Sequence, residues 1–318
     1  MQSILLKRTL IKSNIYFFYF FSLLSNATPW LYESDIEYAL ITNELTLNCG
    51  VIIKSVSASP QSIEKINNLI LSQDYENLNI DCKNSLKKAK TILLNKFTKK
   101  NISFGFQTGV DNLYLQEKGE RYPHDESIFY QNSQVINDFF YKIKISKNIA
   151  GYNFDGTEFS YIFKKNSVIR VGSFNRWWSP SDNTSLILSN TSRPIFTFGI
   201  QNYKSIPFKN SFLKFFGNYD YDIFIGRLEK NREVSNALLF GNRFSFSPTD
   251  YLNFSLLRVA QFGGKGRKVN SDVIKNMILG KDTTNSNLDY LDQPGNQIAG
   301  IDFLFYLPKK KNISLYGQ

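Results

Sequence analysis

Polar and apolar side chains alternate with a period of two along most of the chain after residue 101. Ile102, Phe104 and Phe106 alternate with small or polar residues, and the same rhythm returns at 139–146. This alternation, rich in aromatic and β-branched residues, is typical of β-strands with one buried face. Further strands are predicted near 152–163, 167–173, 195–201, 211–228, 236–246, 251–262, 297–307 and 313–317. The range 211–228 is long enough for a hairpin that turns at Asn218.

The segment ahead of these strands has a helical pattern instead. Ser34 and Glu37 have the S-x-x-E spacing of a capping box, which predicts one helix start. Ser59 followed by Pro60 predicts a second start, and Ser85 opens a third stretch with an apolar face and a lysine-rich face. Helices of about a dozen residues are marginal alone, so we expect them to pack together or against the strands.

The N-terminus has the features of an export signal. Lys7, Arg8 and Lys12 precede an apolar core at 15–24, which ends in small residues before Ala27. We therefore predict a secretory signal peptide at 1–27, cleaved after Ala27. The alternative is an amphipathic or buried N-terminal helix.

The composition points to a membrane barrel. Aromatic residues make up 15% of the chain, more than a soluble core needs, yet mean hydropathy is −0.28. No run after the N-terminus approaches the roughly 18 apolar residues of a spanning helix. Together these features favour an outer-membrane β-barrel over its alternative, a soluble β-sandwich. Lys142 and Lys144 would each cost about 2–4 kcal/mol in hydrocarbon, so we expect them to face the barrel interior.

The formal charge of +11 suggests contact with anionic lipid headgroups or an acidic polymer. Nucleic acid is disfavoured, because the basic residues are scattered and no helix-turn-helix, zinc or RNP signature is present.

The sequence gives little support for catalysis. His124 is the only histidine, and no cluster with metal-ligand spacing or G-x-S-x-G turn accompanies it. Asp220 and Asp222 share a strand face and could in principle serve a glycosidase, but nothing else supports one. We expect no enzyme activity, metal or cofactor.

The two cysteines, Cys49 and Cys82, both lie in the helical segment. An exported chain meets an oxidising compartment, so we predict a disulfide between them, worth about 3 kcal/mol. Two buried free thiols are the alternative.

The most unusual stretch is 174–194, FNRWWSPSDNTSLILSNTSRP. It connects the predicted strands at 167–173 and 195–201, and a connection of this length is usually functional or disordered. Its tryptophans and its Leu-Ile-Leu run are too apolar to remain in water, so we expect the segment to fold back onto or into the barrel.

This stretch also carries side chains suited to sugars. Tryptophan faces stack on pyranose rings, while arginine, asparagine and aspartate bond hydroxyls and carboxylates. The candidate ligand-binding residues are Arg176, Trp177, Trp178, Asp182, Asn190 and Arg193. The alternative is a plug that only keeps the barrel occluded, and Arg243, Arg258 and Arg267 are equally compatible with a structural role.

Several motifs in order resemble the capsule assembly protein Wzi family. They are the tryptophan turn with SLILS and RP at 174–194, PWLYESD at 29–35, RVAQFGGKGR at 258–267, PGNQIAGID at 294–302 and the terminal LYGQ. One departure is that Ser179 and Ser181 stand where the family turn usually has glycine. If those positions need positive φ, serine would be strained there.

The resemblance implies a mainly β fold, an antiparallel transmembrane barrel of about eighteen strands with a helical bundle at its periplasmic end. We thus expect a signal peptide at 1–27, a periplasmic bundle at 28–100 and a barrel at 101–318 that lacks its C-terminal strands. It further implies a monomeric, non-enzymatic, lectin-like outer-membrane protein that attaches or organises capsular polysaccharide or another exopolysaccharide, among outer-membrane lipid and lipopolysaccharide. The alternative function is a pore for small solutes or nascent polysaccharide.

Overall fold

The computed structural model describes residues 28–32, 36–49, 58–71, 78–98, 100–107, 127–149, 151–164, 166–181, 184–189, 192–249, 251–281, 294–307 and 313–318. The predicted signal peptide lies outside these ranges, as do Ser34, His124, Asp182 and Asn190.

Three helices form a bundle near the N-terminus, as expected. They are α1 (Ile36–Cys49), α2 (Ile63–Leu71) and α3 (Ile80–Thr98). Their shared core consists of Leu31, Tyr38, Ile41, Leu45, Ile63, Ile66, Ile70, Cys82, Leu86, Ala89 and Leu93. Within the described residues, no helix has the length and apolar character needed to cross a membrane.

The starts of α2 and α3 are set by caps that differ from the predicted ones, and the predicted cap of α1, Ser34, lies outside the described residues. The hydroxyl of Ser62 accepts the backbone N–H of Lys65, at 3.0 Å, so α2 begins at Ile63 and not beside Pro60. The side chain of Asn79 accepts the N–H of Cys82 at 2.7 Å, which places the start of α3 ahead of Ser85. Asparagine is as good an N-cap as serine. Asn79 was not recognised as the cap because Asp81 and Lys83 interrupt the apolar pattern at the start of the helix.

A disulfide joins α1 to α3. Cys49 and Cys82 are bonded, with 4.8 Å between their Cα atoms and a sequence separation of 33. The bond therefore closes the segment that contains α2, and it pins the two long helices of the bundle together.

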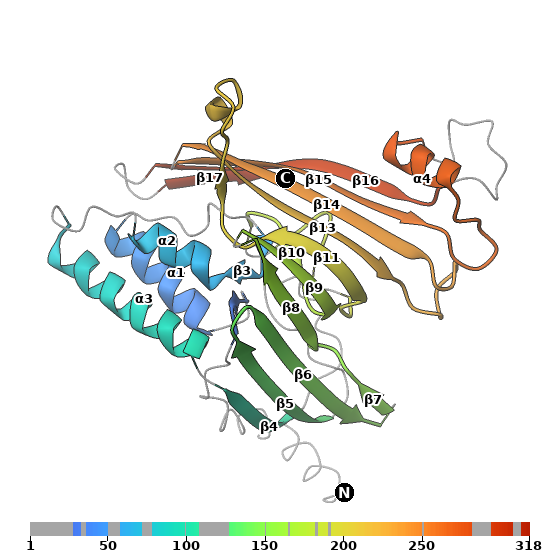
Figure 1. Cartoon of the computed structure of the whole chain (residues 1–318), viewed down its shortest axis with the longest axis horizontal. Coiled ribbons are helices and arrows are strands. Elements are labelled where there is room, and N and C mark those ends of the chain that lie inside the picture. The colour runs from blue at the N-terminus through green and yellow to red at the C-terminus, as the bar shows by residue number, and fades with distance from the viewer. Residues whose placement is uncertain are drawn as a thin grey trace, which may run out of the picture.

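One large antiparallel sheet makes up most of the remaining structure (Figure 1). Its strand order is β17-β16-β15-β14-β13-β11-β9-β8-β6-β5-β4, with β12 and β7 paired at the side. The bounds are β4 (Asn101–Gln107), β5 (Ser127–Ile136), β6 (Phe139–Asn148), β7 (Gly151–Asn153), β8 (Glu158–Phe163), β9 (Ser167–Ser173), β11 (Phe196–Asn202), β12 (Ile206–Pro207), β13 (Asn218–Arg227), β14 (Leu238–Thr249), β15 (Leu252–Phe262), β16 (Gln297–Leu307) and β17 (Ile313–Gly317).

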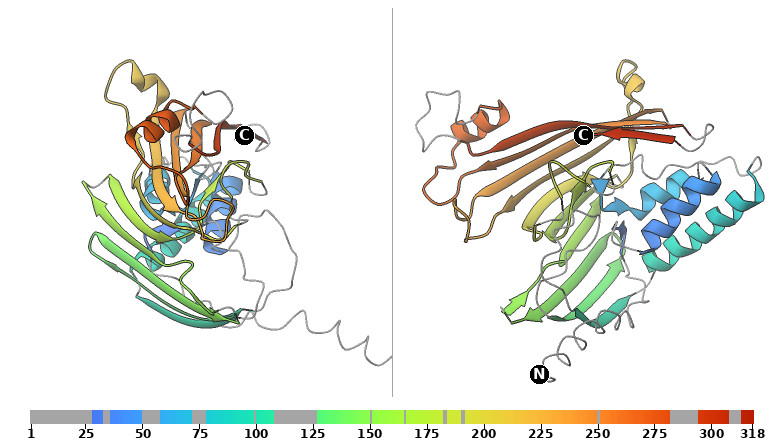
Figure 2. Two further views of the ribbon diagram at one scale, coloured as in Figure 1. Left: turned by 90° about the vertical axis from the view of Figure 1, so that its right-hand side faces the viewer. Right: turned by 180° about the vertical axis from the view of Figure 1, so that it is seen from behind.

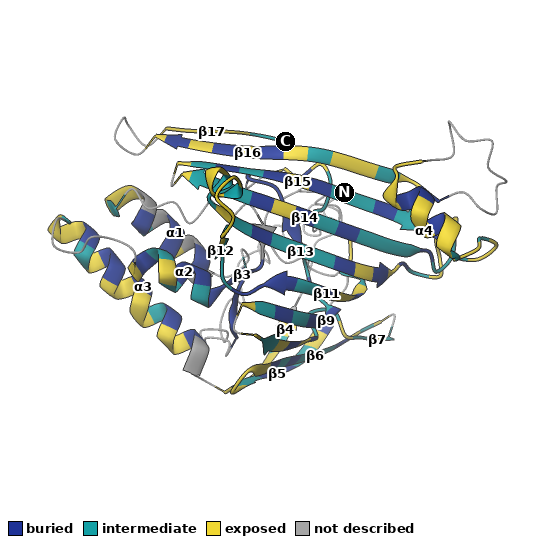
Figure 3. Cartoon of the chain, turned by 45° about the horizontal axis from the view of Figure 1, so that its top comes forward, coloured by how far each residue is buried: buried dark blue, intermediate teal, exposed yellow. Residues whose placement is uncertain are grey.

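The sheet is curved, and its two faces differ in chemistry. The concave face is polar and buried: Arg170, Arg243 and Asp302 are at most 2% exposed. The convex face exposes large apolar side chains instead, including Phe104, Phe106, Phe159, Tyr161, Phe196, Phe198, Leu256, Ile301, Phe303 and Leu307. Figure 3 shows buried positions interspersed with less buried ones along the strands. Lys142 is 6% exposed and lies over the ring of Tyr32, so this predicted interior lysine does lie on the concave side.

The helical bundle lies at one end of the curved sheet, and α4 (Ser271–Ile278) lies at the opposite end (Figures 1 and 2). Asn270 caps α4 by accepting the N–H of Val273 at 2.8 Å. The helix packs Val273 and Met277 on Ala260 and Phe262, which belong to the convex face. Below, these are called the bundle end and the α4 end.

Two predicted strand ranges were wrong in detail, and one strand was not predicted. The range 211–228 is not a hairpin: a 3-10 helix, η3 (Leu213–Phe216), precedes the single strand β13. The range 152–163 is split into β7 and β8 by a turn. Strand β5 was missed, because the polar run at 131–134 places polar residues on both faces and hides the alternation.

Candidate functional site

The segment 174–195, here called the tryptophan loop, leaves β9 at the α4 end and folds back over the concave face (Figure 1). Its strand β10 (Trp177–Trp178) pairs antiparallel with β2 (Ala58–Ser59), which comes from the chain between α1 and α2. Next to it, β1 (Trp30–Leu31) pairs with β3 (Gln61–Ser62). We call the short strands β1, β2 and β3 the bundle segment, because they adjoin the helices of the bundle. The tryptophan loop, which comes from the α4 end, thus meets the bundle segment inside the curve of the sheet.

Hydrogen bonds fix Trp178 from several directions. Its backbone N–H donates to the carbonyl of Leu188 at 3.0 Å, and its indole N–H donates to Asp222 Oδ2 at 3.2 Å. The side-chain amide of Gln318 donates to the Trp178 carbonyl at 2.7 Å, and the Ser185 hydroxyl donates to the same oxygen at 3.0 Å. These bonds hold the tryptophan in one position against the sheet.

Both tryptophans are buried. Trp177 is 2% exposed and Trp178 is 0% exposed. Trp178 packs with Phe224 and Leu257, and Ile187 and Leu188 from the same loop close the cluster. Neither indole therefore offers a free face on which a sugar ring could stack.

The serines at the expected glycine positions are not strained. Among the described residues other than glycine, positive φ occurs at Asn137, Lys164 and Asn236, and so not at Ser179 or Ser181. The Ser179 hydroxyl accepts the N–H of Ser181 at 3.1 Å. The turn therefore accommodates serine through an ordinary backbone conformation and a local hydrogen bond.

Two arginines and three aromatic rings form a stack beside the tryptophan loop. The Cζ atom of Arg170 lies 4.2 Å from the ring centroid of Trp30 and 3.8 Å from that of Phe174. The Cζ atom of Arg176 lies 4.2 Å from the ring centroid of Phe174 and 4.4 Å from that of Phe224. Each guanidinium is thus held between two rings, an arrangement that stabilises a cation away from water.

Carboxylates balance these buried cations. The Arg170 Nε lies 2.7 Å from Glu158 Oε1, and Arg170 also donates to Gln201 at 3.0 Å. Arg176 is balanced more weakly, with 3.7 Å between its Nε and Asp222 Oδ2. Burial lowers the pKa of Arg176 to about 10, while the charge of Asp222 acts in the opposite direction. Arg176 is therefore the less compensated of the two.

Arg193 has a different environment at the rim of the α4 end. Its side chain is 56% exposed and makes two hydrogen bonds to the carboxylate of Asp155, at 2.9 and 3.0 Å. Hydrogen bonding to Asp155 raises the pKa of Arg193. Of the four predicted ligand residues that the structure describes, Arg193 is the exposed one, and it stands apart from Arg176, Trp177 and Trp178.

Asp220 and Asp222 have separate structural partners. Asp220 pairs with Lys65 of α2 at 2.6 Å and accepts a hydrogen bond from Ser205. Asp222 accepts the hydrogen bond of the Trp178 indole and forms the ion pair with Arg176. Both carboxylates therefore anchor neighbouring elements to β13. Across the described residues, no group of three or more His, Cys, Asp or Glu could hold a metal ion.

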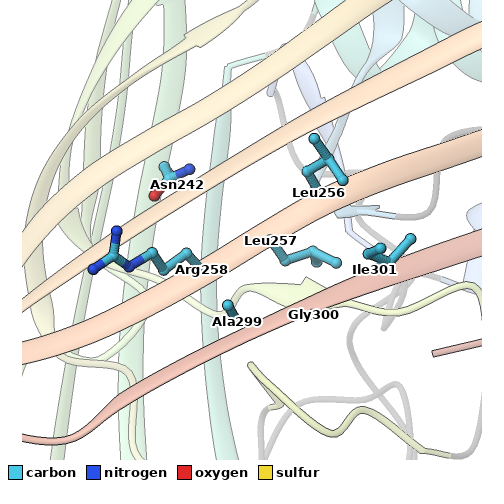
Figure 4. Close-up of a pocket in the computed structure, with 7 residues that line it drawn as sticks. All are labelled: Asn242, Leu256, Leu257, Arg258, Ala299, Gly300 and Ile301. Atoms are coloured by element: carbon cyan, nitrogen blue, oxygen red, sulfur yellow. The ribbon is translucent and has the colours of Figure 1, made fainter. Parts of the chain in front are cut away.

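A pocket of about 410 Å³ opens on the convex face, over β14, β15 and β16 (Figure 4). It is lined by Asn242, Leu256, Leu257, Arg258, Ala299, Gly300 and Ile301. Arg258 donates to the carbonyl of Ile278 at 2.8 Å and to that of Met277, so it satisfies the C-terminal end of α4. Arg243 faces the other way and donates to Asp302 at 3.2 Å.

The interior stack and its ion pair include residues that were not among the predicted ligand residues: Trp30, Arg170, Glu158, Phe174 and Phe224. Arg170 carried a readable signal, since it is a charged residue between Ile169 and Val171 in a strand. The same reasoning that placed Lys142 would have placed it on the concave face. Its contact with Trp30, far away in the sequence, had no local signal.

Comparison with known proteins adds an independent line of observation. The family model described as capsule assembly protein Wzi matches residues 114–318. An uncharacterized 55.8 kDa protein in the cps region of Klebsiella pneumoniae is 30% identical over 155 residues, which are 48% of this chain and 30% of that protein.

A solved structure has a similar fold. It is that of Wzi from Escherichia coli, described as an outer membrane protein involved in group 1 capsule assembly and as a carbohydrate binding β-barrel. The TM-score is 0.68 at 21% sequence identity, and the match covers 87% of this chain and 59% of that one. The matched fold is thus the large antiparallel sheet preceded by helices, and the matches cover 59% of the solved structure and 30% of the Klebsiella pneumoniae protein, less than two thirds of either.

Proposed function

Since the chain belongs to the capsule assembly protein Wzi family, we propose that it is an outer-membrane protein that binds surface polysaccharide and helps to attach or organise it as a capsule. The role is that of a binding protein and not of an enzyme. The name of the Escherichia coli relative, which describes carbohydrate binding and capsule assembly, is consistent with this proposal.

The convex face of the sheet supports the membrane location. Phe104 is 68% exposed, Ile301 63% and Phe196 60%, and all three lie on strands of the same large sheet. So many apolar side chains on one continuous face are unfavourable in water but favourable in hydrocarbon. The polar concave face is then the interior of the barrel.

One observation above all favours binding over conduction: the tryptophan loop and the bundle segment meet inside the curve of the sheet. The pairing of Trp178 with Ala58 and the buried stack around Arg176 lie inside the curve of the sheet, where a pore would run. An occluded interior suits a protein that holds a polymer at its outer mouth.

We assign direct contact with the sugar to the exposed part of the tryptophan loop at the α4 end. Arg193 has a guanidinium suited to hydroxyls and to uronate carboxylates, and its partner Asp155 adds an acceptor. Asp182 and Asn190 are proposed contacts on their sequence alone, since they lie outside the described residues. Arg176, Trp177 and Trp178 act indirectly, by holding the loop in position.

The test is to measure binding of purified capsular polysaccharide to the detergent-solubilised protein, for example by biolayer interferometry with immobilised protein. We expect saturable binding of polysaccharide and no single-channel conductance in planar lipid bilayers. A stable open channel without polysaccharide binding would overturn the proposal in favour of a pore.

A further inference from the structure

The chain between β12 and β13 forms a short loop that stands away from the convex face at the bundle end (Figures 1 and 2). We call residues 208–217 the phenylalanine loop. Its sequence is FKNSFLKFFG, which combines four phenylalanines with two lysines. None of the contacts described for the tryptophan loop involves it.

The tip of the loop exposes unusually large apolar side chains. Phe212 is 81% exposed and Phe215 is 78% exposed, and Lys209 and Lys214 beside them are exposed too. Phenylalanine at a loop tip is costly in water, because each ring presents a large apolar area to the solvent. Their pairing with lysines is the composition of segments that lie at a lipid surface.

The loop holds this shape through its own backbone. Lys214 N–H donates to the carbonyl of Asn210 at 3.0 Å, and Phe212 N–H donates to the Asn210 side chain at 2.9 Å. Gly217 ends η3 with a φ of 69°, and a Cβ at this position would lie 1.8 Å from the carbonyl oxygen of Ser247. Only glycine can make this turn, so the chain direction at the base is fixed.

The base of the loop continues into aromatic residues on the convex face of the sheet. The ring centroid of Phe208 lies 4.6 Å from Tyr219 of β13, and Phe216 lies 5.8 Å from Phe246 of β14. Phe246 in turn lies 5.1 Å from Phe254 of β15. The band therefore spans three neighbouring strands at the bundle end, as an aromatic girdle of a membrane barrel does.

We infer that the phenylalanine loop is a lipid anchor: Phe212 and Phe215 enter the interfacial zone of the leaflet at the bundle end, and Lys209 and Lys214 bind anionic phospholipid headgroups. The inference rests on the proposed outer-membrane location. When the convex face contacts lipid, a loop that projects from it at the end of the strands lies at headgroup level. Basic residues at that level are attracted to negatively charged lipid.

Three single-cysteine variants carrying an environment-sensitive NBD label test the anchor in vesicles of phosphatidylethanolamine and phosphatidylglycerol. The native cysteines are bonded to each other, so only the new thiol reacts. Phe215→Cys reports on the loop, Ile301→Cys reports on the convex face of the sheet, and Leu47→Cys reports on an exposed apolar site of the bundle, where Leu47 is 68% exposed.

We expect a blue-shifted emission at 215 that is quenched by lipid with a spin label near the headgroup. The label at 301 should be quenched by lipid with a deep spin label, and the label at 47 only by aqueous iodide. If 301 reports lipid while 215 behaves like 47, the anchor is overturned and the membrane location stands. If 301 and 215 both report water, both proposals fail.

The headgroup preference is tested with Lys209→Gln/Lys214→Gln in the background of the labelled Phe215→Cys variant. We expect the blue shift to decrease when phosphatidylglycerol is replaced by phosphatidylcholine, and the double lysine variant to lose this dependence. Lys87→Gln/Lys90→Gln on α3 removes the same charge from an exposed helix face and should leave the dependence intact. A dependence that survives equally in both variants would contradict the role of the two loop lysines.

Discussion

The indole N–H of Trp178 donates to Asp222 Oδ2 at 3.2 Å, which ties the tryptophan loop to the middle of β13. The same indole is fully buried and packs edge-on against Phe224, with 5.6 Å between ring centroids. This single side chain therefore combines packing and hydrogen bonding at the point where the loop meets the sheet.

Replacing Trp178 with alanine should destabilise the protein by about 3–5 kcal/mol, because a large buried ring is removed and a cavity remains. Trp178→Phe keeps most of the packing but loses the hydrogen bond to a carboxylate, so we expect a smaller loss of about 1.5–3 kcal/mol. The free energy of unfolding in urea, measured on protein inserted in lipid vesicles, checks both values. Equal losses for the two variants would contradict the role of packing.

The Arg170–Glu158 ion pair should matter far more than an exposed pair of the same kind. Its side chains are 1% and 0% exposed, so Glu158→Ala leaves an uncompensated buried cation. We expect a loss of about 3–5 kcal/mol in the free energy of unfolding. The matched control is Glu229→Ala, which removes the partner of Arg232 in a pair that is 45% and 40% exposed. That change should cost at most about 1 kcal/mol, and a similar cost for both variants would count against the predicted difference.

The disulfide between Cys49 and Cys82 should stabilise the bundle by about 3 kcal/mol, since it closes a loop that contains α2. Limited proteolysis checks this, with faster cleavage inside the bundle expected after reduction. The double variant Cys49→Ser/Cys82→Ser should show the faster cleavage without reductant. Reductant should then have no further effect, and an additional effect would show that it acts elsewhere.

Arg193→Ala should lower the affinity for capsular polysaccharide about tenfold, the equivalent of one lost charge-assisted hydrogen bond. The control is Arg232→Ala, because Arg232 lies in the connection between β13 and β14 at the same end of the sheet and is also exposed and paired. Biolayer interferometry with both variants gives the comparison. An equal loss for Arg193→Ala and Arg232→Ala would indicate attraction by overall charge and not a site at Arg193.

Much of the fold was predictable because the pattern that specifies a strand is local. The range 167–173 matches β9, and 297–307 and 313–317 match β16 and β17. The period of two also placed Lys142 on the correct face, because the alternative was a charge in hydrocarbon. The pattern failed at β5 and at η3, where polar residues on both faces and a run of phenylalanines gave no clear alternation.

The candidate site was only half predictable. The tryptophans and the Leu-Ile-Leu run of the tryptophan loop predicted that the loop would be buried, and this prediction needed only the sequence of the loop itself. Whether an indole faces a ligand or the core depends instead on what lies across from it. For Trp178 that is Ala58 and Asp222, which are distant in the sequence.

The sequence by itself therefore determined most of the strands, the two faces of the sheet and the segment of interest, because these follow from the chemistry of neighbouring residues. Only the tertiary structure decided that Arg176 is stacked between Phe174 and Phe224 while Arg193 stays at the rim. Burial is a property of the assembled fold: it depends on contacts between segments that no local pattern brings together.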